Sequence, residues 1–172
     1  MDHSESVQDY VITEDERLPF QYLVNDIIPR SPELAYLYGI IQYYGALDSQ
    51  IDEYLIINLD SQDVPLAKVT AEMLNYVYSG AGIFGGTEFL TSLAAIDSMP
   101  APFKDNPAMI ISSINSLVSS TMMGYYSEWS GYGSTRLAQP NDRVLEYAPI
   151  SWSQIGYPGP SLGYRALRQY EF

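Results

Sequence analysis

The residues of this chain that could carry out chemistry are carboxylates and aromatic rings. Its 172 residues include no cysteine and a single histidine, His3, which excludes thiol catalysis, disulfides and cysteine-ligated zinc or iron–sulfur centres. A metal site would need carboxylates alone. Asp48 and Asp52 are four residues apart and Glu14 and Glu16 lie near a helix start, so each pair could share a helix face. We interpret both pairs as solvated surface charges or as N-terminal helix charges.

Aromatic residues gather in the last third of the chain, which ends in SWSQIGYPGPSLGYRALRQYEF (residues 151–172). Such rings need a surface that covers them, and the Pro158-Gly159-Pro160 run restricts the backbone to turn or extended geometry. We therefore expect this segment to dock on another protein, although each ring could instead close the chain's own core. The predicted interface residues are Trp129, Trp152, Tyr157, Pro158, Gly159, Pro160, Tyr164 and Arg165.

The net charge of −13 is unevenly distributed. Residues 125–172 hold four acids and four arginines, so the first 124 residues carry the whole excess of negative charge. This distribution argues against nucleic acid and anionic membrane surfaces as partners, and it suits a salt-tolerant protein or one with a basic partner. No run reaches the roughly 18 apolar residues of a membrane span. The start, MDHSESVQDY, lacks an apolar export signal and an Arg-Arg pair, so we expect a cytoplasmic location, or an extracytoplasmic one if a signal was removed.

The elements that must position these residues are predicted to be helices. Thr13 and Glu16 have capping-box spacing and open a first helix that ends before Pro29, although Pro19 conflicts with an uninterrupted helix. Ser31-Pro32 and Asn106-Pro107 combine an N-cap residue with proline at the first helical position. Further helices are predicted over 31–45, 49–59, 65–78 and 107–123, with a short one opening at Thr87.

Apolar stripes predict which helix faces are buried. The helix from Ser31 has the face Leu34, Leu37, Tyr38 and Ile41, the helix over 65–78 has Val69, Met73, Leu74 and Val77, and the helix over 107–123 has Ile110, Ile111, Ile114, Leu117 and Val118. We predict a mainly α fold with little or no sheet. It comprises a flexible acidic N-terminus (1–12), a helical body (13–124) and a long irregular aromatic arm with Gly and Pro (125–172), which belongs to the same domain.

Two motifs in the arm carry a family resemblance. MMGYYSEWSGYGSTR (122–136) and ISWSQIGYPGPSLGYR (150–165) resemble the C-terminal signature of the gluconate 2-dehydrogenase subunit 3 family, most specifically over residues 152–160. The resemblance implies a non-catalytic small subunit that stabilises or escorts a large FAD-dependent dehydrogenase of the glucose–methanol–choline type. It implies that FAD binds the large subunit, that this chain holds no cofactor, and that a cytochrome subunit can join the complex. Many members carry a twin-arginine signal, which is missing from the start of this chain.

Two other functional classes remain compatible with the sequence. A carbohydrate-binding module would use exposed Trp and Tyr rings as stacking platforms in a shallow groove. A stand-alone carboxylate-dependent enzyme, such as a glycosidase or lyase, would place two facing acids in a deep pocket. The arrangement of rings and acids in the folded chain distinguishes these classes.

Overall fold

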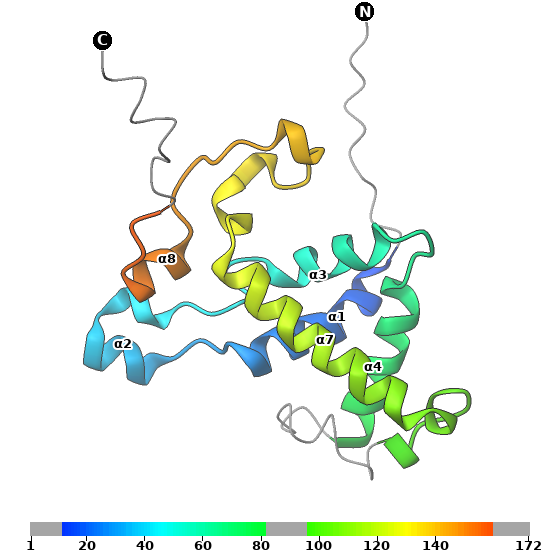
Figure 1. The fold of residues 1–172 in the computed structure, drawn as a ribbon. Helices are drawn as coiled ribbons and strands as arrows, with labels where there is room; N and C mark the ends of the chain where they lie inside the picture. The colour runs from blue at the N-terminus through cyan, green and yellow to red at the C-terminus, as the bar shows by residue number, and fades with distance from the viewer. Residues whose placement is uncertain (1–11, 82–95, 160–172) are drawn as a thin grey trace, which may run out of the picture.

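Four helices form the body of the computed structural model, which describes residues 12–81 and 96–159. They are α1 (Glu14–Ile27), α3 (Ile51–Asp60), α4 (Ala67–Ala81) and α7 (Pro107–Tyr126). Helices α1 and α3 each contact the other three (Figure 1). The described ranges contain no β-strand, so the predicted mainly α class is confirmed. One apolar core unites the four helices and includes Phe20, Leu23, Ile51, Leu55, Leu74, Ile110 and Ile114.

The helix starts lie where the cap signals predict them. The Thr13 hydroxyl accepts a hydrogen bond from the Glu16 backbone N–H at 3.2 Å, and the Glu16 carboxylate accepts one from the Thr13 N–H at 2.8 Å. Ser31 caps α2 (Pro32–Tyr38), and Asn106 caps α7. Each cap satisfies an N–H group that has no partner within its helix.

Two boundary predictions were wrong. Pro19 does not interrupt α1, because its ring is buried in the body of the protein and packing offsets the one backbone hydrogen bond that proline cannot donate. The helix that begins after Ser31 ends at Tyr38 instead of continuing to residue 45. Gly39 has φ of +100°, which a glycine adopts readily, and the chain continues as a short 3₁₀ helix, η1 (Ile40–Tyr43).

The apolar stripes are buried in α4 and α7 but not in α2. In α4, Met73, Leu74 and Val77 face the core as predicted, whereas Val69 is exposed. In α7, the residues Ile110, Ile114 and Leu117 are buried, with Ile111 and Val118 packed at the edge of the core. The predicted face of α2 points away from the core. The short helix predicted from Thr87 lies outside the described residues.

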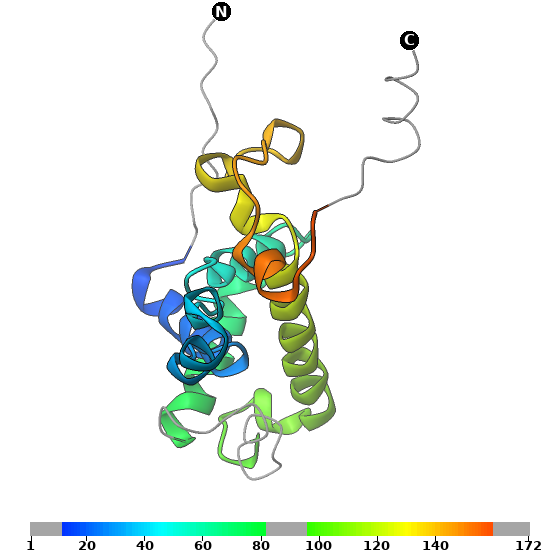
Figure 2. The same cartoon turned by 90° about the vertical axis from the view of Figure 1, so that its left-hand side faces the viewer.

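The arm folds back over one end of the body. After α7 it forms two short 3₁₀ helices, η3 (Trp129–Thr135) and η4 (Pro140–Asp142), and then α8 (Ile150–Ile155). Figure 2 shows the arm leaving the C-terminal end of α7 and returning toward it. Helix α8 contacts α7 and also η1, which precedes it by more than 100 residues. None of the helices in 12–81 and 96–159 has the length and apolar character needed to cross a lipid bilayer.

Candidate docking site on the aromatic arm

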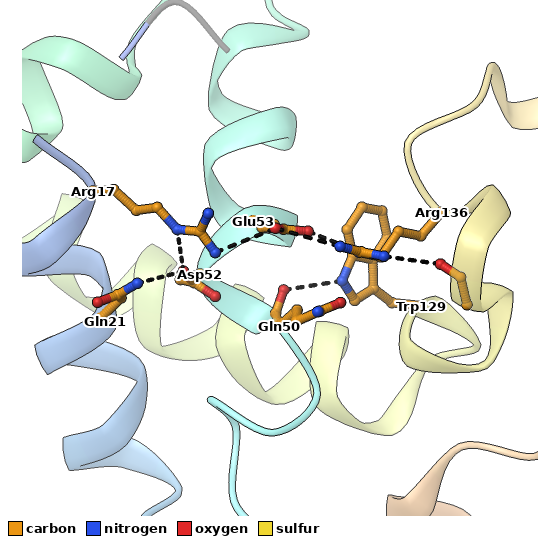
Figure 3. A network of polar contacts seen from close by, with 8 residues as sticks. Arg17, Gln21, Gln50, Asp52, Glu53, Trp129 and Arg136 are labelled. Carbon is orange, nitrogen blue, oxygen red and sulfur yellow. Dashed lines mark hydrogen bonds and ion pairs between the residues drawn. The ribbon is translucent and has the colours of Figure 1, made fainter. Parts of the chain in front are cut away.

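An ionic network attaches the arm to the start of α3 (Figure 3). Arg136, just after η3, donates from Nε to the Glu53 carboxylate at 2.8 Å. Arg17 of α1 donates to the same carboxylate at 3.2 Å and to Asp52 at 2.6 Å. Gln21 adds a donor to Asp52 at 3.4 Å. The two adjacent acids of α3 therefore hold both the first helix and the arm.

The network explains how two acids are tolerated inside the protein. The Asp52 and Glu53 side chains are buried, and a buried carboxylate is strongly disfavoured unless it is paired. The guanidinium groups of Arg17 and Arg136 supply two positive charges, and the positive end of the α3 dipole lies at the same point. Breaking one pair would leave a buried charge with insufficient compensation.

Asp52 is an N-terminal helix charge, as predicted, but the prediction that it is solvated was wrong, as was the prediction that it shares a helix face with Asp48. Asp52 is not a solvated surface charge but a buried partner of Arg17. Asp48 precedes α3, so it does not share a helix face with Asp52, and it pairs with Arg30 at 2.6 Å. The Arg30 guanidinium holds the pKa of Asp48 below its usual value. Glu14 and Glu16 lie in the first turn of α1, as predicted.

Trp129 connects η3 to the N-terminal end of α3. Its indole N–H donates to the Gln50 carbonyl at 3.0 Å, and its ring meets the Tyr54 ring edge-on at 5.5 Å between centroids. Gln50 has φ of +54°, an unusual conformation for a residue other than glycine, at the residue that precedes α3. The Trp129 residue is only 3% exposed, so it forms part of the chain's own core.

Trp152 fastens α8 to the end of α7. Its indole N–H donates to the Tyr126 carbonyl at 3.0 Å, and it is 5% exposed. The Gln154 side chain makes further bonds, donating to the Ile41 and Tyr44 carbonyls at 2.9 and 3.0 Å and accepting from the Tyr125 hydroxyl. Burial raises the pKa of Tyr125 to about 12, so this hydroxyl stays a donor at neutral pH.

Between these anchors the surface forms a hollow of about 430 Å³, here named the ring-lined hollow. Six aromatic residues line it, with two charged residues and one serine: Tyr54, Tyr126, Trp129, Tyr132, Trp152, Tyr157, Glu128, Arg143 and Ser127. The Arg143 guanidinium lies 5.4 Å from the Trp129 ring centre and 6.0 Å from that of Tyr132. The Tyr132 hydroxyl donates to Glu128 at 2.8 Å, which raises the pKa of Tyr132.

The residues of the ring-lined hollow can bind a ligand or a partner through ring stacking and charge. Aromatic faces can stack on apolar or sugar surfaces, and Arg143 adds a positive charge beside them. Glu128 is the one carboxylate among the lining residues, so this hollow does not present the two facing acids that a carboxylate-dependent enzyme needs. Within 12–81 and 96–159, no cluster of three or more histidine or acidic side chains is placed to hold a metal ion.

The predicted interface residues are divided between core and surface. Trp129 and Trp152 are covered by their own chain, whereas Tyr157 is 44% exposed at the rim of the hollow, in edge-on contact with Trp152 at 5.1 Å. Pro158 is exposed and Gly159 is half-buried. The three remaining predicted residues lie outside the described ranges: Pro160, Tyr164 and Arg165.

Sequence reasoning did not single out the polar residues that anchor the arm. Glu53 is typical of an acid at a helix start, and nothing in its sequence neighbourhood pairs it with Arg136, which is 83 residues away. Gln154 lies within the second arm motif, and its polar side chain between Trp152 and the glycine at 156 is the only local signal of a structural role. These pairings depend on long-range contacts.

Comparisons with known proteins return no match to a family model, to a curated protein or to a solved structure. The indications of function are therefore the geometry of the described residues and the resemblance of the arm motifs. Both concern the same stretch of chain, since the ring-lined hollow is built mainly from residues 126–157.

Proposed function

We propose that this chain is the non-catalytic small subunit of an FAD-dependent dehydrogenase of the glucose–methanol–choline type, soluble or membrane-associated. In this proposal the chain stabilises or escorts the large subunit, which holds FAD and oxidises a sugar, a sugar acid or a glycoside. A cytochrome subunit can join this complex as a third component. The observation that carries the proposal is the arm, which is fixed on the body and exposes rings at the ring-lined hollow.

A fixed arm suits docking for a physical reason. Glu53 binds Arg136, and Tyr126 and Gln154 hold α8, so the exposed ring of Tyr157 sits on a surface that is ordered before any partner binds. Binding then loses less conformational entropy than it would with a loose segment. Tyrosine, tryptophan and arginine are also the residues that most often anchor protein interfaces.

Co-expression with an FAD-dependent dehydrogenase of the glucose–methanol–choline type, chosen from the genome that encodes this chain, tests the proposal. An affinity tag on the small chain should recover the large subunit with its flavin. Tyr157→Ala should lower the affinity of the complex about 30-fold, equivalent to roughly 2 kcal/mol at an interface anchor. Tyr147→Ala is the matched control, because Tyr147 is an exposed arm tyrosine that does not line the hollow. Failure of the wild-type chain to recover any flavoprotein would contradict the proposal.

The ring-lined hollow supports carbohydrate binding as a second candidate function. Tyr126 and Tyr157 are exposed in this hollow, where Arg143 and Glu128 also line the surface, and exposed rings beside polar groups are the arrangement expected for stacking on sugar rings. Titration with malto-, cello- and xylo-oligosaccharides, followed by tryptophan fluorescence, tests it. Saturable binding that Tyr157→Ala abolishes and Tyr147→Ala preserves would favour this function. A flat titration with all three series would exclude it for these sugars.

A further inference from the structure

Arg143 brings to the ring-lined hollow a positive charge that no acid of the described part of the chain pairs with. Its Nε donates to the Ala138 carbonyl at 3.1 Å, and within the described residues this side chain makes no other hydrogen bond and no ion pair. Glu128 also lines the hollow, but it accepts a hydrogen bond from the Tyr132 hydroxyl instead of pairing with Arg143. The terminal nitrogens Nη1 and Nη2 of Arg143 are therefore available to a ligand.

The Arg143 guanidinium is held in position before a ligand binds. Its central carbon lies 5.4 Å from the ring centre of Trp129 and 6.0 Å from that of Tyr132, and the bond to Ala138 orients Nε. A planar guanidinium presents two parallel N–H donors that match the two oxygens of a carboxylate. Because the side chain is already ordered, binding a carboxylate would cost little further rotamer freedom.

Two exposed tyrosine rings in the same hollow offer surfaces for stacking. Tyr157 meets buried Trp152 edge-on at 5.1 Å between ring centres, and Tyr126 meets buried Tyr125 in the same way at 5.2 Å. Each exposed ring therefore rests against a buried one and still keeps accessible surface. Sugar rings pack their C–H faces on aromatic surfaces of this kind, and the Glu128 carboxylate can accept hydrogen bonds from sugar hydroxyl groups.

We propose that the ring-lined hollow binds an acidic sugar, with the carboxylate of a hexuronate on Arg143 and its ring against Tyr126 and Tyr157. This inference rests on carbohydrate binding as the candidate function of the hollow, and it names the class of sugar. A neutral sugar would leave the Arg143 nitrogens without an anionic partner. A doubly charged phosphate is a poorer match, because one guanidinium with Glu128 nearby compensates a single negative charge.

The acidic surplus of the chain is compatible with such a ligand. The net charge of −13 belongs to the first 124 residues, whereas residues 125–172 hold four acids and four arginines. Most of the hollow is built from this neutral arm. At physiological ionic strength exposed charges are screened over about 8 Å, so a short ligand is affected mainly by the groups that line the hollow.

Calorimetric titration of the full chain with trigalacturonate and with its methyl ester tests the proposal. The two probes have the same sugar rings and differ in charge. The acid should bind the wild-type chain at least about tenfold more tightly than the ester, because the ester cannot form the charge-assisted pair with Arg143. This comparison needs no variant, so it decides the question even if a substitution at Arg143 disturbs folding.

Variants assign the preference to Arg143. Arg143→Gln should reduce the preference for the acid to about twofold or less, and Arg143→Lys, which keeps the charge without the planar fork, should give an intermediate value. Lys104→Gln is the matched control. It removes an exposed positive charge in η2 (Phe103–Asp105), just before the N-terminal end of α7, whereas the hollow lies at the C-terminal end of that helix. It should keep the full preference.

Other results overturn the inference in distinguishable ways. Equal affinity for acid and ester refutes the acidic sugar and leaves carbohydrate binding in place. Binding of neither probe also refutes it, and the titrations with neutral oligosaccharides then decide whether the carbohydrate candidate stands. A preference that survives Arg143→Gln shows that another group binds the carboxylate. Competition by triglutamate as strong as that by trigalacturonate would show that the hollow recognises acidic peptides instead of sugars.

Discussion

Trp152 belongs to the arm and stabilises the folded chain. Its ring is buried against its own chain and its N–H is bonded to the Tyr126 carbonyl. Trp152→Ala should therefore lower the free energy of unfolding of the isolated chain by about 3 kcal/mol or more, because it leaves a large cavity. Urea denaturation followed by circular dichroism measures this loss. Trp152→Phe, which keeps a ring and removes the N–H, should cost only about 1 kcal/mol.

An unchanged midpoint for Trp152→Ala, combined with loss of the partner, would reverse the assignment. It would show that the ring contributes to docking rather than to the stability of the chain. Tyr157→Ala supplies the comparison at the neighbouring position, because the Tyr157 ring is much more exposed and its removal should change the stability of the isolated chain far less.

The contact between Asp48 and Arg30 should make the stability of the folded chain depend on pH. Its hydrogen bond with Arg30 lowers the pKa of the folded state below 3.8, so the unfolded chain takes up this proton first as the pH falls. The contribution of Asp48 is fully present above about pH 5 and is lost as the pH falls through 3.8 toward the folded pKa. The stability difference between wild type and Asp48→Asn should be present at neutral pH and smaller at about pH 3.

Urea titrations of both proteins at the two pH values measure this difference. Asp63→Asn is the control, since Asp63 is an exposed acid in the loop after α3. A gap between wild type and Asp48→Asn that stays constant over the acidic range would show that the Arg30 contact contributes nothing to folding.

At the scale of elements, the start of α3 is the point to which α1 and the arm are both attached. Arg136→Ala removes one of two partners from buried Glu53 and frees η3 from α3. It should lower the free energy of unfolding by about 2 kcal/mol or more, because Arg17 compensates only part of the buried charge. Thermal or urea denaturation measures the effect, and Glu53→Gln in the Arg136→Ala background should recover part of the loss.

Lys68→Ala provides the control for this prediction. Lys68 pairs with Glu16 at 3.6 Å, but its side chain is exposed, and such surface pairs contribute little to stability. Equal losses for Arg136→Ala and Lys68→Ala would mean that the network holding the arm is no stronger than an ordinary surface pair.

At the scale of the whole molecule, we predict that the purified chain alone binds no FAD and oxidises no sugar. The sequence has no glycine-rich dinucleotide turn after a strand, and its described part is entirely helical apart from loops and turns. Flavin absorbance and dye-linked dehydrogenase assays on the isolated chain check this. Flavin bound at close to one per chain would contradict both this prediction and the proposed division of labour between subunits.

Local sequence determined the helices and much of their core. The cap residues Thr13, Ser31 and Asn106 satisfy N–H groups within a few residues, and an apolar stripe such as Ile110 to Leu117 has the period of the helix itself. Both effects act over short stretches of chain, so they can be predicted without knowing the fold. The composition likewise excluded thiol chemistry and disulfides.

Only the tertiary structure decided which of these residues are buried and which are exposed. Asp52 resembles a surface acid until Arg17 and Gln21 are brought beside it, and Trp152 resembles an interface ring until it contacts the end of α7. The face of α2 has the pattern of a core stripe, yet Leu37 and Tyr38 remain exposed. Burial depends on contacts between segments up to 113 residues apart, as in the bond from Gln154 to Ile41, and no local pattern contains that information.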